Sequence, residues 1–177
     1  MKREMKKGWL LIGVWALMGL SGCLPDVEVP TAEEQLQDQL NVVNKLQLEK
    51  DLKTIDDSLA KRNIVALKEP LGVRYVVHAM GSGTKPTLTS RIRAKYEGRL
   101  FANKAIFAKL DTIDITLQEL IIGWQTTVPL MPNGSKFTLY IPSGYGYGPV
   151  DVRDNNATVL IPRNSNLIFD IELLDVQ

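Results

Sequence analysis

The side chains that most often carry covalent or metal chemistry are scarce in this chain. It contains one cysteine, Cys23, and one histidine, His78, among 177 residues. A nucleophilic triad needs a base beside its nucleophile, and a zinc cluster needs several Cys or His ligands. The sequence also lacks the HExxH, GxSxG and P-loop patterns. We therefore expect no nucleophilic triad, no metal site and no cofactor.

Acidic pairs are the next candidates for chemistry. Asp111 and Asp114 lie in a polar connection, where aspartates are more often solvated turn residues. What remains is an aromatic and aliphatic set, which is either an ordinary core or a dry pocket for an apolar group. Its members are Tyr96, Phe107, Leu120, Ile121, Trp124, Tyr145, Tyr147, Ile161 and Phe169.

Four segments show the alternation of apolar and polar residues that is typical of half-buried strands. They are residues 72–80, 91–100, 136–142 and 166–176. Residues 117–131, between the second and third segments, predict a short buried helix that Pro129 limits. One helix on one face of an antiparallel sheet is an α+β arrangement, and residues 63–177 are enough for one core.

Residues 1–23 have the pattern of a bacterial secretion signal. Four basic residues precede an apolar run of 13 residues, Gly8 to Leu20. As a helix this run spans about 20 Å, less than the roughly 30 Å hydrocarbon core of a bilayer. The ending Leu20-Ser21-Gly22-Cys23 resembles the lipobox of bacterial lipoproteins. We expect residues 1–22 to be a signal peptide and Cys23 to be lipidated, with an ordinary signal peptide or a short anchor as the alternative.

The next segments are an extended tether at residues 23–30 and a helical segment at 31–62. Thr31 and Glu34 fit a capping box, and apolar residues then recur every three or four positions. This apolar stripe must pack against another surface, either the chain's own domain or a second copy in a homodimer. Alternatively, the segment is a plain spacer. The whole chain carries a formal charge of +1, so no basic excess favours nucleic-acid binding.

From about Leu71 to the C-terminus, the order of the motifs resembles that of the FKBP-type peptidyl-prolyl cis-trans isomerases. The resemblance implies an antiparallel sheet of five or six strands wrapped around a short helix, with the ligand cleft between them. The matching segments are Gly81-Ser82-Gly83, Arg93-Ala94-Lys95-Tyr96-Glu97-Gly98, Leu120-Ile121-Ile122-Gly123-Trp124, Met131-Pro132-Asn133-Gly134, Tyr145-Gly146-Tyr147-Gly148, Ile161-Pro162 and the strand from Leu167 to Leu174.

The same resemblance implies a role for each matching side chain. Trp124 would be the floor on which a substrate proline ring lies. The backbone of Leu120 would orient the peptide, the Tyr147 hydroxyl would bind a substrate carbonyl, and Ile161 would point inward from the loop at residues 151–161. The implied walls of the pocket are Tyr96, Phe107, Ile121 and Phe169.

The sequence also departs from the family pattern. Ala108 follows Phe107 where the family usually has aspartate, and the preceding turn at residues 101–106 is longer by about one residue. Ile113 and Ile115 replace aromatic residues. These changes imply activity that is reduced compared with the family.

Two functions therefore remain open. The first is a prolyl isomerase that acts on X-Pro segments of unfolded or exported polypeptides. It would be held by the lipid on Cys23 to a membrane of the cell envelope, facing the periplasm or the surface. The alternative is a catalytically weak module that binds proline-containing peptides or acts as a chaperone on the same fold.

Overall fold

The computed structural model describes residues 28–177. The predicted signal peptide at residues 1–22, the predicted lipidation site Cys23 and residues 24–27 of the tether lie outside the described residues. None of the helices in the described part of the chain is long and apolar enough to cross a membrane.

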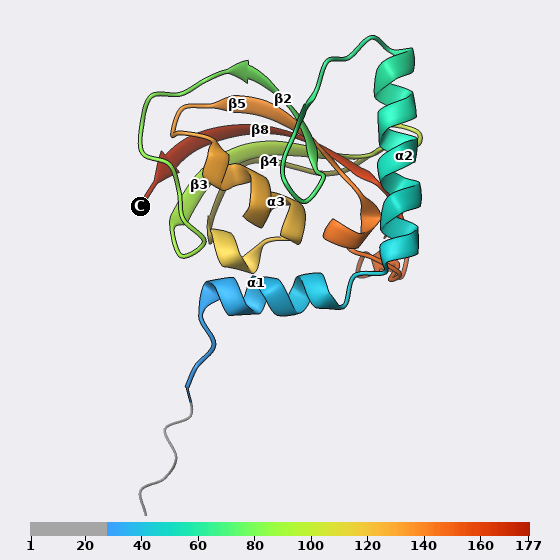
Figure 1. Cartoon of the computed structure of the whole chain (residues 1–177), viewed down its shortest axis with the longest axis horizontal. Coiled ribbons are helices and arrows are strands. Elements are labelled where there is room, and N and C mark those ends of the chain that lie inside the picture. Colours follow the sequence, from blue (N-terminus) through green and yellow to red (C-terminus); the bar gives the residue numbers. More distant parts are fainter. Residues whose placement is uncertain (1–27) are drawn as a thin grey trace, which may run out of the picture.

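Six antiparallel strands form one curved sheet (Figure 1). Its strand order is β1-β2-β5-β8-β3-β4. The bounds are β1 (Leu67–Lys68), β2 (Arg74–Ala79), β5 (Lys136–Ile141), β8 (Leu167–Val176), β3 (Arg91–Leu100) and β4 (Ile106–Thr116). The four predicted strands are confirmed as β2, β3, β5 and β8, and the α+β class is confirmed with them.

Strand β4 was missed, and the prediction that Asp111 and Asp114 are turn residues is wrong. Both lie on β4, where Asp111 pairs with Lys95 at 2.9 Å and Asp114 pairs with Arg93 at 3.1 Å. A register shift in the β3–β4 pairing opposite Lys95 breaks the period-two alternation on β4. The charged face of this edge strand further hides the pattern that identified the other strands.

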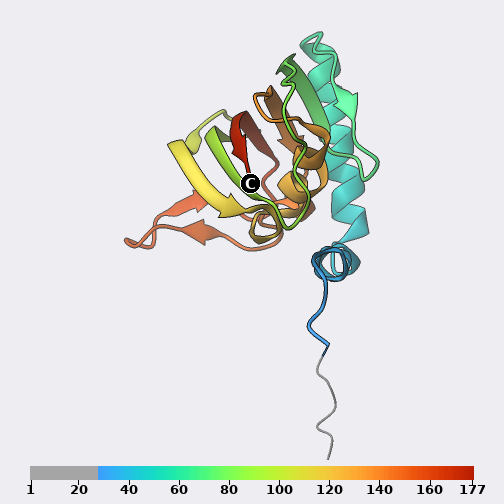
Figure 2. The same ribbon diagram turned by 90° about the vertical axis from the view of Figure 1, so that its left-hand side faces the viewer.

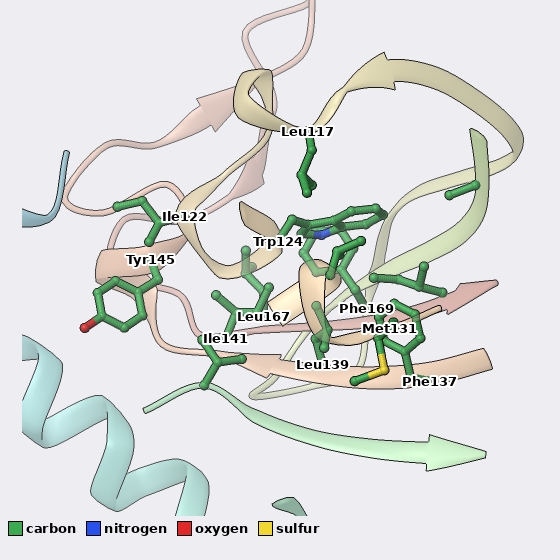
Figure 3. Close-up of a cluster of buried hydrophobic side chains, with 14 of the residues drawn as sticks. Leu117, Ile122, Trp124, Met131, Phe137, Leu139, Ile141, Tyr145, Leu167 and Phe169 are labelled. Atoms are coloured by element: carbon green, nitrogen blue, oxygen red, sulfur yellow. The ribbon is translucent and has the colours of Figure 1, made fainter. Parts of the chain in front are cut away.

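The predicted short helix lies on the concave face of the sheet (Figure 1). It consists of α3 (Ile122–Thr127) between two single 3₁₀ turns, η1 (Leu117–Glu119) and η2 (Val128–Leu130). Gly123 permits the close approach, because a Cβ there would lie 2.6 Å from Cγ2 of Ile141 on β5. Figure 3 shows the resulting core, with Leu117 pointing towards the indole of Trp124.

Two further pieces follow strand β5. The turn η3 (Ser143–Tyr145) leads into a hairpin made of β6 (Val152–Arg153) and β7 (Val159–Ile161). In Figure 2 this hairpin extends away from the body of the domain. Residues 143–149, between β5 and the hairpin, carry Tyr147 and line a groove together with Ile122, the first residue of α3.

The N-terminal helical segment is two helices, α1 (Ala32–Asn41) and α2 (Lys45–Lys61). The predicted capping box is present, because the Glu34 amide donates to the Thr31 hydroxyl and the Glu34 carboxylate accepts from the Thr31 amide. A second N-cap, Asn44, accepts from the amide of Gln47 at 3.0 Å and starts α2 in a new direction. Figure 1 shows the result: α1 runs beneath α3, and α2 stands along the end of the sheet.

Both helices are packed on the chain's own domain. Ile55 and Leu59 of α2 form a second cluster with Phe101 and Ile168, on the face of β8 opposite Phe169. Four apolar residues of α1, of the elbow between the helices and of the start of α2 pack against the main core; they are Leu36, Leu40, Val43 and Leu48. Most of the stripe is thus covered within one chain, although Leu46 is exposed. Homodimerisation through this segment stays a prediction that the solution mass of the full chain would test.

A buried carboxylate ties α2 to the turn η3. Asp51 is 4% exposed, and its Oδ2 accepts from the Ser143 amide at 3.0 Å and from the Ser143 hydroxyl. Its Oδ1 accepts from Gln47 at 2.7 Å. Because a buried carboxylate must be hydrogen-bonded to be stable, this contact fixes the place where α2 meets the domain.

We expect Asp51→Ala to lower the free energy of unfolding by about 1 to 3 kcal/mol, because it leaves the buried Ser143 hydroxyl without its acceptor. Chemical denaturation of the full chain measures this change. The matched control is Asp57→Ala on the same helix, which removes only an exposed pair with Lys53 and should barely alter stability. Equal stability of the Asp51 variant and the wild type would refute the structural role of this contact.

Candidate functional site

Four aromatic rings from four segments meet on the concave face of the sheet. Phe169 on β8 is the common member, with ring-centroid distances of 5.5 Å to Trp124, 5.6 Å to Phe107 and 5.9 Å to Tyr96. Tyr96 also meets Trp124 edge to face at 5.5 Å. These separations lie in the favourable range for aromatic pairs, so the four rings form one cohesive cluster.

Strand pairing explains why the rings converge. On β3, Gly98 pairs with Phe169 of β8 and with Ala108 of β4. A Cβ at Gly98 would lie 2.7 Å from Cε2 and Cζ of Phe107 and 2.9 Å from Cε1 of Phe169. The missing side chain of Gly98 therefore makes the space in which Phe107 and Phe169 touch.

The four rings differ in how much surface they leave open. Trp124 and Phe169 are 3% and 4% exposed, so most of the indole is packed into the core. Tyr96 on β3 and Phe107 on β4 are half-buried. The cluster therefore has a covered base made of Trp124 and Phe169 and an accessible rim made of the other two rings.

The two tyrosines of the Tyr145-Gly146-Tyr147 segment have different surroundings. Tyr145 is buried, and its hydroxyl donates to the carbonyl of Leu71 at 3.1 Å. In Figure 3 this hydroxyl points away from the other labelled side chains of the core. Tyr147 is 39% exposed. Partial burial raises the pKa of the Tyr147 hydroxyl, and the nearby Tyr96 phenol adds to this rise. Burial likewise raises the pKa of Tyr96, so both phenols stay protonated at neutral pH and can donate hydrogen bonds.

The remaining predicted site residues fall into two groups. Leu120 and Ile121, just before α3, line a groove of about 550 Å³ together with Tyr147. The Ile121 carbonyl accepts from the Trp124 amide at 2.9 Å, which links this groove to the aromatic cluster through one turn of helix. Ile161 on β7 is 3% exposed and belongs to the core.

The position after Phe107 contributes no carboxylate. Ala108 is half-buried opposite Gly98, and the neighbouring acids are engaged elsewhere. Glu97 pairs with Lys109 at 2.9 Å, which lowers the pKa of its carboxyl, and Asp111 is highly exposed beside Lys95. Neither acid replaces the aspartate that the family pattern has at this position.

Several side chains that shape the site were not singled out from the sequence. Gly98 lay inside a motif but had no assigned role, and buried Gln125 looked like any polar helix residue. Gln125 Nε2 donates to the carbonyl of Leu120 at 2.6 Å and to Gln39 Oε1 of α1 at 3.3 Å. Its apolar surroundings in the sequence were the one available signal, since a lone glutamine in a buried helix needs partners.

Between residues 28 and 177, which the structure describes, no group of three or more His, Cys, Asp or Glu side chains could hold an ion. The four rings of the site offer aromatic surface, and the phenols of Tyr96 and Tyr147 offer neutral hydrogen-bond donors.

Comparison with known proteins agrees with this geometry. The family model described as FKBP-type peptidyl-prolyl cis-trans isomerase matches residues 82–174, which include all four rings and Tyr147. The chain is 31% identical over 178 aligned residues to the FKBP-type peptidyl-prolyl cis-trans isomerase FkpA of Aeromonas hydrophila, covering 95% of this chain and 64% of that protein. It thus spans slightly less than two thirds of the length of that relative.

Solved structures show the same fold. A peptidyl-prolyl cis-trans isomerase from Pseudomonas syringae matches with a TM-score of 0.59 and 26% identity, covering 85% of this chain and 98% of that one. FkpA from Escherichia coli matches with a TM-score of 0.61 and 26% identity, covering 82% and 63% of the two chains. In both cases the match exceeds residues 63–177 in length, so it includes part of the N-terminal helical segment.

The contact between Phe107 and Phe169 predicts the effect of a methyl group at Gly98. We expect Gly98→Ala to displace one of the two rings and to lower the free energy of unfolding by about 1 to 3 kcal/mol. Chemical denaturation measures this loss. A double-mutant cycle supplies the control, because in a Phe107→Leu background the same substitution should cost less. An identical cost in both backgrounds would show that Phe107 is not the obstacle.

Proposed function

This chain belongs to the FKBP-type peptidyl-prolyl cis-trans isomerase family, and we propose that it catalyses the cis-trans isomerisation of X-Pro bonds in polypeptides. The observation that carries the proposal is the cluster of Tyr96, Phe107, Trp124 and Phe169, with Tyr147 beside its rim. A proline ring is a compact apolar group that fits among aromatic side chains.

Prolyl isomerisation suits a site that holds no nucleophile or metal ligand set. The reaction breaks no covalent bond, and its barrier of roughly 18 to 20 kcal/mol is the loss of amide resonance. Without catalysis it takes tens to hundreds of seconds. The twisted amide has less charge separation than the planar one, so an apolar pocket favours the transition state over the ground state.

Each side chain of the site has its own role in the proposed reaction. Tyr96, Phe107 and Phe169 would surround the proline ring, with the indole of Trp124 beneath it. The Tyr147 hydroxyl, which is protonated at neutral pH and whose raised pKa keeps it so in more basic solution, would donate to a carbonyl of the substrate next to proline. Ile121 would be a further wall, and the backbone of Leu120 would orient the peptide.

We further propose that the enzyme acts on unfolded or newly exported polypeptides while lipid-anchored to a membrane of the cell envelope. The support is in the sequence: the basic head, the apolar run from Gly8 to Leu20, and Leu20-Ser21-Gly22-Cys23. The proline-rich tether after Cys23 would let the domain reach away from the lipid surface.

The second candidate is a catalytically weak module that binds proline-containing peptides or acts as a chaperone. It is favoured by Ala108, which leaves this edge of the site without the carboxylate of the family pattern. The two functions differ in one measurable property. The isomerase accelerates cis-to-trans conversion in a short X-Pro peptide, whereas the module binds the peptide saturably and leaves the rate unchanged. We expect acceleration by the full chain in detergent solution.

The proposed hydrogen bond from Tyr147 predicts that Tyr147→Phe lowers kcat/KM about tenfold, which is the effect of losing about one net hydrogen bond in the transition state. Kinetics with a short X-Pro peptide measure it. Tyr145→Phe is the matched control: it removes a bond to the Leu71 carbonyl, so it should lower stability but leave turnover per folded molecule unchanged. Full turnover in the Tyr147 variant would remove its hydroxyl from the mechanism.

The proposed anchor predicts that Cys23→Ser abolishes lipidation, so that the protein either appears in the soluble fraction or keeps its signal peptide uncleaved. Metabolic labelling with a radioactive fatty acid checks lipidation directly, and the label should be lost in the variant. The control is Ser21→Ala, which keeps the cysteine and a small residue before it. A labelled, membrane-bound Cys23→Ser protein would contradict the lipoprotein assignment.

A further inference from the structure

A groove of about 550 Å³ separates the elbow between α1 and α2 from the catalytic domain. One wall is made of Leu120, Ile121 and Tyr147, which belong to the candidate site. The opposite wall comes from the elbow, with the side chains Gln39, Val42, Val43, Asn44 and Gln47. The groove therefore borders three residues of the candidate site, Leu120, Ile121 and Tyr147, although none of the four rings lines it, and the elbow supplies a wall that residues 63–177 alone do not have.

Two buried polar contacts hold the elbow in place, one on each side of the groove. On the α1 side, Gln125 bridges Gln39 and the Leu120 carbonyl. On the α2 side, Asp51 accepts from Ser143, at the start of the segment that carries Tyr147. The helices are thus fixed to the same two backbone segments that carry site residues, so the separation of the two walls is set by the fold.

The lining has the chemistry of an uncharged peptide site. Val42 is 84% exposed at the C-cap of α1, although it is apolar, and Pro149 is exposed on the facing side. Glu119 is the one charged side chain in the lining of this groove, where its carboxylate accepts from the Thr116 amide at 3.0 Å, and the rest of the lining is neutral. Gln39 Oε1, Asn44 Oδ1 and Gln47 Nε2 are engaged within the protein. The other amide atoms of these side chains, Gln39 Nε2, Asn44 Nδ2 and Gln47 Oε1, are the neutral donors and acceptor that suit a peptide backbone.

The volume also fits such an occupant, because about 300 to 1,000 Å³ is the usual range of pockets that enclose a small ligand. An extended peptide advances about 3.3 to 3.6 Å per residue, so a few residues of substrate occupy a groove of this kind. Because Ile121 and Tyr147 line the groove, a peptide whose X-Pro pair lies in the aromatic cluster would enter the groove beside these two residues.

We propose that the α1–α2 elbow is a substrate-binding wall, and that this groove binds the uncharged, extended residues that flank the X-Pro pair on one side. The inference rests on the proposed function, whose substrate class it narrows to longer, apolar unfolded segments. The N-terminal helices then determine specificity as part of the catalytic unit. Val42 is the side chain that the bound peptide covers.

The test compares an uncharged X-Pro tetrapeptide with two longer peptides, extended by four apolar residues on the N-terminal or on the C-terminal side. We expect one extension to raise kcat/KM of the full chain about fivefold to tenfold, the effect of burying roughly one apolar side chain. In Val42→Glu the ratio of the long to the short peptide should fall towards one. Leu46→Glu is the matched control, since Leu46 is 80% exposed nearby but does not line the groove, and it should keep the full ratio.

Failure of this inference is distinguishable from failure of the proposed function. Equal turnover of all three peptides, or an undiminished ratio in Val42→Glu, overturns the groove while isomerase activity stands. If no peptide is turned over, fluorescence polarisation with the labelled long peptides replaces kinetics. A weaker affinity in Val42→Glu than in Leu46→Glu then supports the groove, and equal affinities or no binding overturn it.

Discussion

The contact of Phe169 with three other aromatic rings is the interaction on which the rest of the structure depends. Phe169 lies on β8, which is paired on both sides by β3 and β5 and so cannot shift its register without breaking two ladders. Its ring meets Tyr96, Phe107 and Trp124, which come from β3, β4 and α3. The ring at the centre of the cluster is therefore held by the central strands of the sheet, and a reaction that depends on shape and desolvation requires such a fixed position.

The same strand has a structural role on its other face. Ile168, next to Phe169, packs against Ile55 and Leu59 of α2. Because successive residues of a strand point to opposite faces, one pair of neighbours joins the aromatic site to the N-terminal helices. The helices pack on the domain through this cluster. Asp51 of α2 accepts a hydrogen bond from Ser143, and Gln39 of α1 accepts one from Gln125, so both helices also contact the segments that border the groove.

Much of this arrangement was predictable from the sequence, because its signals are local. Alternation on residues 166–176 placed Phe169 on the buried face, and the motif around Trp124 placed that ring on a short helix. The rest depends on tertiary contacts that leave no local pattern. The bulge opposite Lys95 hid β4, the space at Gly98 is defined by rings from two other strands, and Asn44 divides a helical segment whose apolar period continues across the break. Burial of Asp51 likewise follows from the fold alone.

We propose that the proline ring of a substrate lies among the rings that meet at Phe169. An NMR spectrum of the full chain with an X-Pro peptide tests this placement, because nuclear Overhauser effects report which side chains contact the proline ring. We expect contacts from the proline ring to the aromatic protons of Tyr96 and Phe107, together with exchange between the cis and trans peptide signals. Contacts confined to the outer face of the sheet, around His78 and Lys136, would contradict it.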